Sequence, residues 1–277
     1  MTTTTSTRKR IATERGNLCS TISSTLQKGW VGATIGLLLL IAAWAIVGVA
    51  PSTRAIVPTP WETVKSVLDE GTTFYIPNLV ATLRRAGTGY LWGNVVGLAI
   101  ASLLLITPRL EELVMQLGVI SQCLPITAIG PLVFVLFGGR VTSIFLAALL
   151  VFFTTMSGVL LGLRSVSPSL IDMVTAFGGG AFVKLRKLQL IATIPATVTA
   201  LKVAVPAAIL GAIVGEYLGG LDDGVGAAMV ASQRNQTPER VWALSVLVGL
   251  LSLTGYGLLA WVGRVIAPWS KTNGFNT

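Results

Sequence analysis

The chain has 277 residues, of which 53% are hydrophobic and only 11% are charged, whereas soluble domains carry about 25% charged residues. This composition excludes an ordinary soluble domain and indicates an integral membrane protein built as one bundle of helices. The net charge of +9 would suggest nucleic acid as a partner of a soluble chain. Here the basic residues flank apolar runs, so membrane topology explains them better and no nucleic-acid binding is expected.

Catalytic chemistry is not expected in this chain. It has no histidine and only two cysteines, Cys19 and Cys123, which lie far apart in different settings, so neither a metal site nor a histidine-based catalytic set is predicted. No G-x-x-x-x-G-K-[ST] phosphate loop occurs either. We therefore expect no enzyme activity, no metal and no cofactor in the chain itself, which leaves a transporter, a channel or a structural membrane role.

Residues 1–28 are rich in threonine and serine and carry the basic run "RKR". A signal peptide would place its apolar core sooner and follow it with a cleavage site of small residues. We predict a disordered cytoplasmic tail at 1–28, followed by a membrane domain at 29–270.

Six apolar segments are long enough to cross a bilayer, which needs about 20 residues per helix. They are 30–50, 86–106, 113–139, 142–163, 190–218 and 242–263. The predicted fold is all-α and integral to the membrane, with about six transmembrane helices and both termini on one side. Twelve of the 20 lysines and arginines fall on that side, which predicts that both termini are cytoplasmic.

Between the first two spans, residues 51–85 are predicted to lie outside, with the amphipathic piece Trp61–Leu68 along the membrane surface. In the second span, small residues recur at every fourth position, which predicts close packing against another helix; these are Gly89, Gly93, Gly97 and Ala101. The outer stretch 219–240 is rich in glycine, and its adjacent Asp222 and Asp223 fit a solvated turn.

Several residues within the spans are unusual for a membrane. Pro125 and Pro131 in the third span, with two further prolines in the fifth, would each remove a helical hydrogen bond, either to line a pathway or only to bend the helix. Lys202 and Glu216 lie in or near the fifth span, where a charge usually faces the protein interior or a cavity. For Lys202 we weigh a pairing role against contact with a substrate, and for Glu216 a place at the outer interface is the alternative.

The cytoplasmic segment 164–189 has a helix–turn–helix pattern. Ser167 can cap a helix with Pro168 at its first position, and about two helical turns would then reach Phe177. Gly178 begins a run of three glycines that ends this helix, and a second helix leads into the fifth span. The result is a small rigid knob with a basic end, which would suit anionic lipid or an acidic protein surface equally well.

This segment resembles the cytoplasmic coupling loop of importer permeases of the ATP-binding cassette class, which is written E-A-A, three residues, G, nine residues, I-x-L-P. Asp172 stands in place of the glutamate, Gly178 matches the glycine, and residues 188–190 fit I-x-L. Further stretches are similar to the nitrate, sulfonate and taurine group of these permeases; they are residues 56–68, 78–93, 124–138, 162–172 and 267–269.

The resemblance implies a bundle like that of type I importer permeases, with a coupling loop at about 165–190. Residues 167–191 would dock on a separate ATPase subunit that binds ATP and Mg²⁺. The residues implied in coupling are Asp172, Gly178, Gly179, Lys184, Arg186 and Lys187.

The implied assembly contains two permease copies, identical or related, around one pathway in the inner membrane of a bacterium, and a periplasmic or lipid-anchored protein that delivers the substrate. The expected substrate is a small anion or organic acid such as a sulfonate, taurine, nitrate or bicarbonate. The residues expected along the pathway are Arg85, Pro125, Pro131, Lys202 and Glu216. A stand-alone channel or ion-coupled carrier is the alternative, but it would need more acids or histidines within the membrane.

Overall fold

The structure is a computed structural model that describes residues 29–53, 56–107, 116 and 125–267. The tail predicted at residues 1–28 lies outside these residues. All the secondary structure in the described part is helical, as the sequence predicts. The chain divides into two units, residues 1–65 and 66–277, which are described separately.

The first unit contains helix α2 (Gly29–Val49), which matches the first predicted span. This helix is apolar on all sides, and Leu37 to Leu40 are each 59–65% exposed, as expected for a helix that contacts lipid. The next helix, α3 (Pro60–Ile106), begins with a capping box. The backbone N–H of Thr59 donates to the Glu62 carboxylate at 2.8 Å, and the backbone N–H of Glu62 donates to the Thr59 hydroxyl at 3.2 Å.

Helix α3 is much longer than the second predicted span. Its only non-helical residue is Gly71, at φ 66° and ψ −164°, where a residue without a side chain is favoured. The predicted start of this helix at residue 86 is wrong, because residues 72–85 belong to the same helix. Arg84 and Arg85 lower the hydropathy there, but Arg85 is only 5% exposed and finds its counter-charges inside the protein.

The second unit continues with five further long or medium helices: α5 (Ile126–Phe137), α6 (Gly139–Arg164), α9 (Leu190–Leu218), α10 (Val225–Arg234) and α11 (Pro238–Ile266). In the described part of the chain, five helices are long and apolar enough to cross a membrane: α2, α3, α6, α9 and α11. Of the predicted span at 113–139, the described portion is mainly the 12-residue α5. Pro125 precedes this helix as its N-cap and does not interrupt it, whereas Pro131 lies inside.

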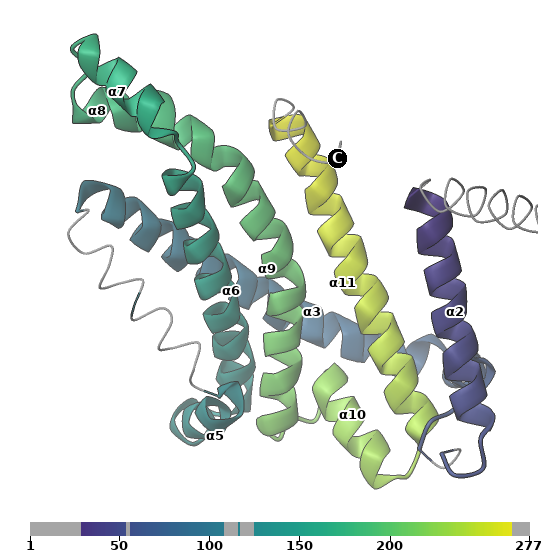
Figure 1. The fold of residues 1–277 in the computed structure, drawn as a ribbon. Helices are drawn as coiled ribbons and strands as arrows, with labels where there is room; N and C mark the ends of the chain where they lie inside the picture. The colour runs from purple at the N-terminus through teal and green to yellow at the C-terminus, as the bar shows by residue number, and fades with distance from the viewer. Residues whose placement is uncertain (1–28, 54–55, 108–115, 117–124, 268–277) are drawn as a thin grey trace, which may run out of the picture. The chain divides into compact units, whose positions relative to one another are not determined.

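The core forms where α6 packs along α9 and α3 crosses them (Figure 1). The predicted stripe of small residues on α3 makes this contact: a Cβ added at Gly93 would lie 2.5 Å from the carbonyl oxygen of Ala148 on α6. The same part of α6 is also close to α9, because a Cβ added at Gly211 of α9 would lie 2.7 Å from the Cα of Ala147. Three backbones therefore meet at close range, as small residues permit in membrane helices.

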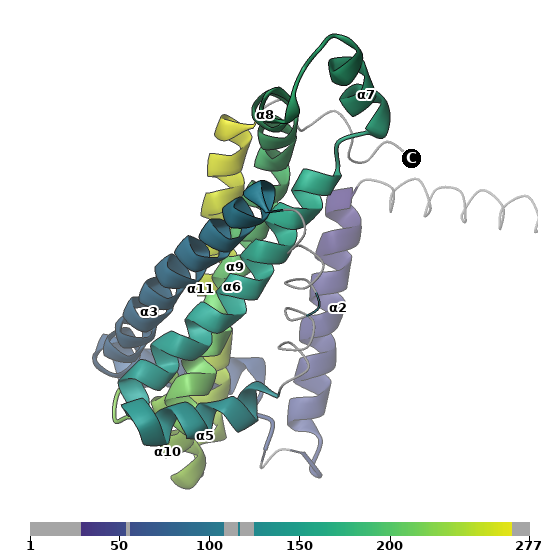
Figure 2. The same ribbon diagram turned by 90° about the vertical axis from the view of Figure 1, so that its left-hand side faces the viewer.

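The segment between α6 and α9 forms a projection beyond the ends of these two helices, and α5 and α10 lie at the opposite end (Figures 1 and 2). It comprises α7 (Pro168–Ala176), the single turn α8 (Ala181–Lys184) and the π-helical turn η2 (Leu185–Gln189), which continues into α9. The predicted helix–glycine turn–helix is confirmed. Ser167 does hold the cap position, but its hydroxyl lies 3.2 Å from that of Ser169 and makes no capping hydrogen bond.

Candidate functional site

The turn after α7 is closed by two backbone hydrogen bonds. The N–H of Gly178 donates to the carbonyl of Thr175 at 2.9 Å, and the N–H of Gly179 donates to the carbonyl of Val174 at 2.8 Å. This pair of bonds is the Schellman motif, which places the residue after the C-cap in the left-handed region. Gly178 has φ +78°, so glycine is favoured there, and backbone hydrogen bonds define the turn at the end of α7.

One face of α7 carries exposed apolar side chains. Leu170, Met173 and Phe177 are 44%, 50% and 86% exposed, and their spacing of three and four residues puts them on one face of the helix. No residue of α7 is buried. An exposed apolar patch at the end of a projection marks an interaction surface more often than a site of chemistry.

The charged residues predicted for coupling belong to the same projection. Asp172 is exposed on α7, Lys184 is half-buried in α8 and Lys187 is exposed in η2. Arg186 also belongs to η2, but its side chain lies outside the described part. The structure thus gathers these residues into one projection, and their role in coupling stays a prediction.

At the other end of α6 and α9, a buried ion pair connects α3 to α9. The Arg85 Nη1 atom donates to Glu216 Oε1 at 2.8 Å, and the two side chains are 5% and 0% exposed. The second oxygen of Glu216 accepts hydrogen bonds from the Thr82 hydroxyl at 2.8 Å and from the backbone N–H of Gly226 at 2.9 Å. Every oxygen of this buried carboxylate is therefore hydrogen-bonded, as burial of a charge requires.

The same network holds the glycine-rich loop between α9 and α10 against α3. Arg85 also donates to the backbone carbonyl of Asp223 at 2.9 Å and forms an ion pair with the Asp223 carboxylate. The backbone N–H groups of Gly224 and Val225 donate to Asn78 and Thr82 at 3.0 Å and 2.8 Å. Because Asn78, Thr82 and Arg85 are spaced by four and three residues, one face of α3 makes all of these contacts.

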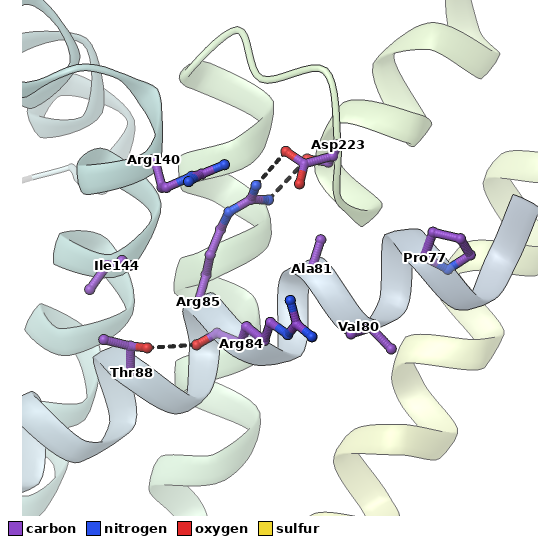
Figure 3. Close-up of a pocket in the computed structure, with 9 residues that line it drawn as sticks. All are labelled: Pro77, Val80, Ala81, Arg84, Arg85, Thr88, Arg140, Ile144 and Asp223. Carbon is purple, nitrogen blue, oxygen red and sulfur yellow. Dashed lines mark hydrogen bonds and ion pairs between the residues drawn. The ribbon is translucent and has the colours of Figure 1, made fainter.

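A cavity of about 450 Å³ adjoins this network (Figure 3). Arginines from two helices line it, namely Arg84 and Arg85 of α3 and Arg140 of α6. Asp223 contributes the carboxylate of the lining, and the remaining wall is formed by Pro77, Val80, Ala81, Thr88 and Ile144. The lining of the cavity therefore combines three arginines with apolar side chains.

Of the residues predicted along a pathway, the structure brings Arg85 and Glu216 together, with Glu216 buried at 1% exposure and not at an interface with solvent. Pro125, Pro131 and Lys202 do not line this cavity. The Lys202 ammonium lies beside Gly263 of α11, where an added Cβ would be 3.3 Å from it. No carboxylate of the described residues pairs with Lys202, so the expected pairing is not seen there.

Sequence reasoning missed Asp223, Arg84 and Arg140. It treated Asp222 and Asp223 as a solvated turn, and Asp223 does lie in a bend with its side chain 54% exposed, yet it pairs with Arg85. A signal was available, because a guanidinium in an apolar helix needs a carboxylate partner. Which acid supplies it depends on contacts between residues more than 130 positions apart.

Comparison with known proteins agrees with these features. The family model described as "binding-protein-dependent transport system inner membrane component" matches residues 93–268, more than half of the chain. The formylaminopyrimidine transport permease protein ThiX of Halalkalibacterium halodurans is 27% identical over 239 residues, which are 86% of this chain and 95% of ThiX. A probable ABC transporter permease protein of Haemophilus influenzae is 29% identical over 230 residues, 82% of this chain and 92% of that protein.

A third relative, the riboflavin transport system permease protein RibX of Chloroflexus aurantiacus, is 27% identical over 165 residues, 59% of this chain and 61% of RibX. The relatives share the description of transport permeases, while the substrates in their names differ. Together with the apolar helices of the bundle, the family match shows a multi-pass membrane protein. The chain belongs to the family of inner-membrane components of binding-protein-dependent transport systems.

Proposed function

We propose that this chain is the permease subunit of an ATP-driven importer and that the α7 projection couples it to a separate ATPase subunit. The observation that carries the proposal is the projection itself: an exposed apolar face, Leu170, Met173 and Phe177, on a helix whose end is fixed by a Schellman motif. The ATPase would bind ATP and Mg²⁺, so the chain needs neither a phosphate loop nor a metal site of its own.

The connections of the projection support mechanical coupling. It is covalently continuous with α6 at one end and, through η2, with α9 at the other. These two helices are packed at glycine contacts such as Gly215 of α9, where an added Cβ would lie 2.8 Å from the backbone N of Ser143 on α6. Because packed cores of this kind move as rigid elements, a displacement of the projection would be transmitted along both helices to the Arg85–Glu216 end.

We propose further that a second copy of the chain, or a related permease, completes the pathway, and that a binding protein delivers the substrate to the face opposite the projection. The proposed substrate is a small anion or organic acid, such as a sulfonate, taurine, nitrate or bicarbonate. The resemblance to that permease group and the basic cavity support this choice. The names of ThiX and RibX state a formylaminopyrimidine and riboflavin, and these compounds are the comparison set for a transport assay.

The proposed location is a bacterial inner membrane, with the projection and both termini in the cytoplasm. Single cysteines test this orientation in a chain whose two native cysteines are replaced by serine. A cysteine in place of Ser52 or Ala231 should react with a membrane-impermeant maleimide from outside. A cysteine in place of Ser167 should react only after permeabilisation. All three positions are exposed. Ser232 is buried at 2% exposure and is unsuitable as a label site. Labelling of Ser167 from outside in intact cells would reverse the proposed orientation.

The coupling proposal is tested by ATP hydrolysis in complexes of the chain with its ATPase, reconstituted in liposomes. Phe177→Asp places a charge on the most exposed residue of the apolar face, at the C-cap of α7. Loss of an aromatic anchor at the centre of an interface costs about 2 kcal/mol or more, which corresponds to docking about 30-fold weaker. Ser169→Ala, on the same helix and also exposed, is the matched control and should hydrolyse ATP at the unsubstituted rate. Full coupling in Phe177→Asp at normal expression would refute docking through this face.

A further inference from the structure

We propose that the cavity between α3 and α6 is a binding site for an organic anion, with Arg84 and Arg140 as the groups that recognise its carboxylate or sulfonate. The proposal rests on the permease function proposed above and names the place where the chain would contact its cargo. It goes beyond the residues predicted from the sequence, because neither arginine was assigned a role.

The charge balance of the cavity supports an anionic ligand. Arg85 is paired with both Glu216 and Asp223, so these three groups carry a net charge of −1, and Arg84 and Arg140 bring the site to +1. No carboxylate of the described residues lies within ion-pair distance of Arg84 or Arg140. Among the described residues, the guanidinium groups of Arg84 and Arg140 have no carboxylate partner and line one cavity, and an oxyanion is the ligand that their N–H donors match.

The three arginines of the cavity differ in how accessible their guanidinium groups are. In Figure 3 the Arg140 side chain, from the start of α6, extends toward the Arg85–Asp223 pair at the upper side of the cavity, and Arg84 lies along α3 below it. Arg84 and Arg140 are both exposed, so their donors are accessible, whereas Arg85 is buried and held by the network. Arg85 and Asp223 therefore form the fixed wall, and the two exposed arginines supply the free donors.

The size and the remaining wall define the rest of the ligand. The cavity of about 450 Å³ falls in the range of sites for small organic ligands, about 300–1,000 Å³, and exceeds what a bare inorganic ion would fill. Its lining also includes the apolar side chains of Pro77, Val80 and Ile144. The ligand class is thus a carboxylate or sulfonate on a small apolar body.

Such an anion can come from two sources, a transported solute or the headgroup of an anionic lipid.

The test uses the chain alone in nanodiscs of phosphatidylcholine and measures binding calorimetrically. Benzenesulfonate is compared with benzenesulfonamide, which has nearly the same shape without the charge. We expect benzenesulfonate to bind and the sulfonamide to bind at least tenfold more weakly, because a charged hydrogen bond contributes about tenfold or more to affinity.

Arg84→Gln and Arg140→Gln should each weaken benzenesulfonate binding about tenfold, and Arg140→Lys should retain part of it. The matched control is Arg234→Gln, which removes an equal charge from an exposed position in α10 outside the cavity and should leave binding unchanged. Equal binding of the two probes, or an equal loss in the control, would overturn the proposal. Because neither arginine makes an ion pair in the described structure, the glutamine variants should fold, and an unchanged melting temperature confirms this.

Nanodiscs that contain phosphatidylglycerol distinguish the two sources. If the solute is the ligand, benzenesulfonate binding should persist in them. If phosphatidylglycerol abolishes it through Arg84 and Arg140, the cavity is a headgroup site and the assignment to cargo is wrong. The ATPase is absent from this experiment, so a negative result leaves the coupling proposal intact, and a failure of coupling leaves this result intact.

Discussion

Replacement of Glu216 by glutamine removes the charge that balances Arg85 while keeping the size and shape of the side chain. Glu216 accepts from the Arg85 guanidinium at 2.8 Å through one oxygen, and from Thr82 and the Gly226 N–H at 2.8 and 2.9 Å through the other. A glutamine has one acceptor oxygen and one donor nitrogen. Its amide nitrogen would therefore face either the Arg85 guanidinium or the Gly226 N–H, both of which are donors. The buried arginine would also lose its fully buried counter-charge.

The expected cost follows from the burial of the pair. Removal of one partner from a buried ion pair destabilises a protein by about 3–5 kcal/mol, and the two side chains here are 5% and 0% exposed. Asp223 remains paired with Arg85 but is 54% exposed, so we expect the lower end, about 3 kcal/mol. The matched control is the pair of Glu70 and Arg240, whose side chains are 25% and 30% exposed; Glu70→Gln should cost about 0–1 kcal/mol.

The free energy of unfolding is measured for each variant by titration with sodium dodecyl sulfate in mixed micelles. A double substitution, Arg85→Gln with Glu216→Gln, should be less destabilising than the sum of the single ones, because it leaves no uncompensated buried charge. Contacting pairs show such coupling at about 0.5–3 kcal/mol. Equal losses for Glu216→Gln and Glu70→Gln, or strict additivity in the double variant, would refute the role of the pair as the buried link between α3 and α9.

Two further predictions concern glycines, each with a matched control. Gly93→Ala should lower the stability of the bundle by about 1–3 kcal/mol, because its Cβ would lie 2.5 Å from a carbonyl oxygen of α6. In the control Gly87→Ala, the added Cβ meets open space on the same helix, so this variant should be neutral or stabilised by up to about 1 kcal/mol. Thermal unfolding in detergent distinguishes the two variants. Gly179→Ala should weaken binding of the ATPase at unchanged bundle stability, because its Cβ would lie 2.7 Å from the carbonyl oxygen of Val174 and would distort the turn. In the control Gly180→Ala, the added Cβ meets no atom within 4 Å, so this variant should bind the ATPase normally. Equal affinities of the two variants in a pull-down would contradict a requirement for a rigid turn.

Local patterns predicted most of the helices. The spans at 30–50, 142–163 and 190–218 agree with α2, α6 and α9 to within a few residues, because their apolar runs are long and are bounded by polar or glycine residues. The packing stripe at Gly89, Gly93 and Gly97 was also predictable, because one residue in four on a helix returns to the same face. In each case the information lies within one helix.

The failures involve contacts between distant parts of the chain. The second span was predicted to start at residue 86, yet the helix also includes residues 72–85, where Arg85 pairs with Glu216 and Asp223. The cavity was not predictable for the same reason, because Arg140 reaches it from α6. Neither the ion pairs of Arg85 nor the approach of Arg140 to the cavity produces a periodic pattern in the sequence.

The central claim is that the α7 projection contacts an ATPase subunit, and site-specific photo-crosslinking tests it most directly. A benzoylphenylalanine is introduced at the position of Phe177 in the tagged chain, and the products formed in native membranes are identified by mass spectrometry. The account predicts a cross-link to a subunit that carries a G-x-x-x-x-G-K-[ST] loop, with a yield that changes when ATP is added. The same probe at Ala231, exposed at the opposite end of the second unit, should give no such product. Cross-links from Phe177 to lipid alone, or equal ATPase products from both positions, would contradict the account.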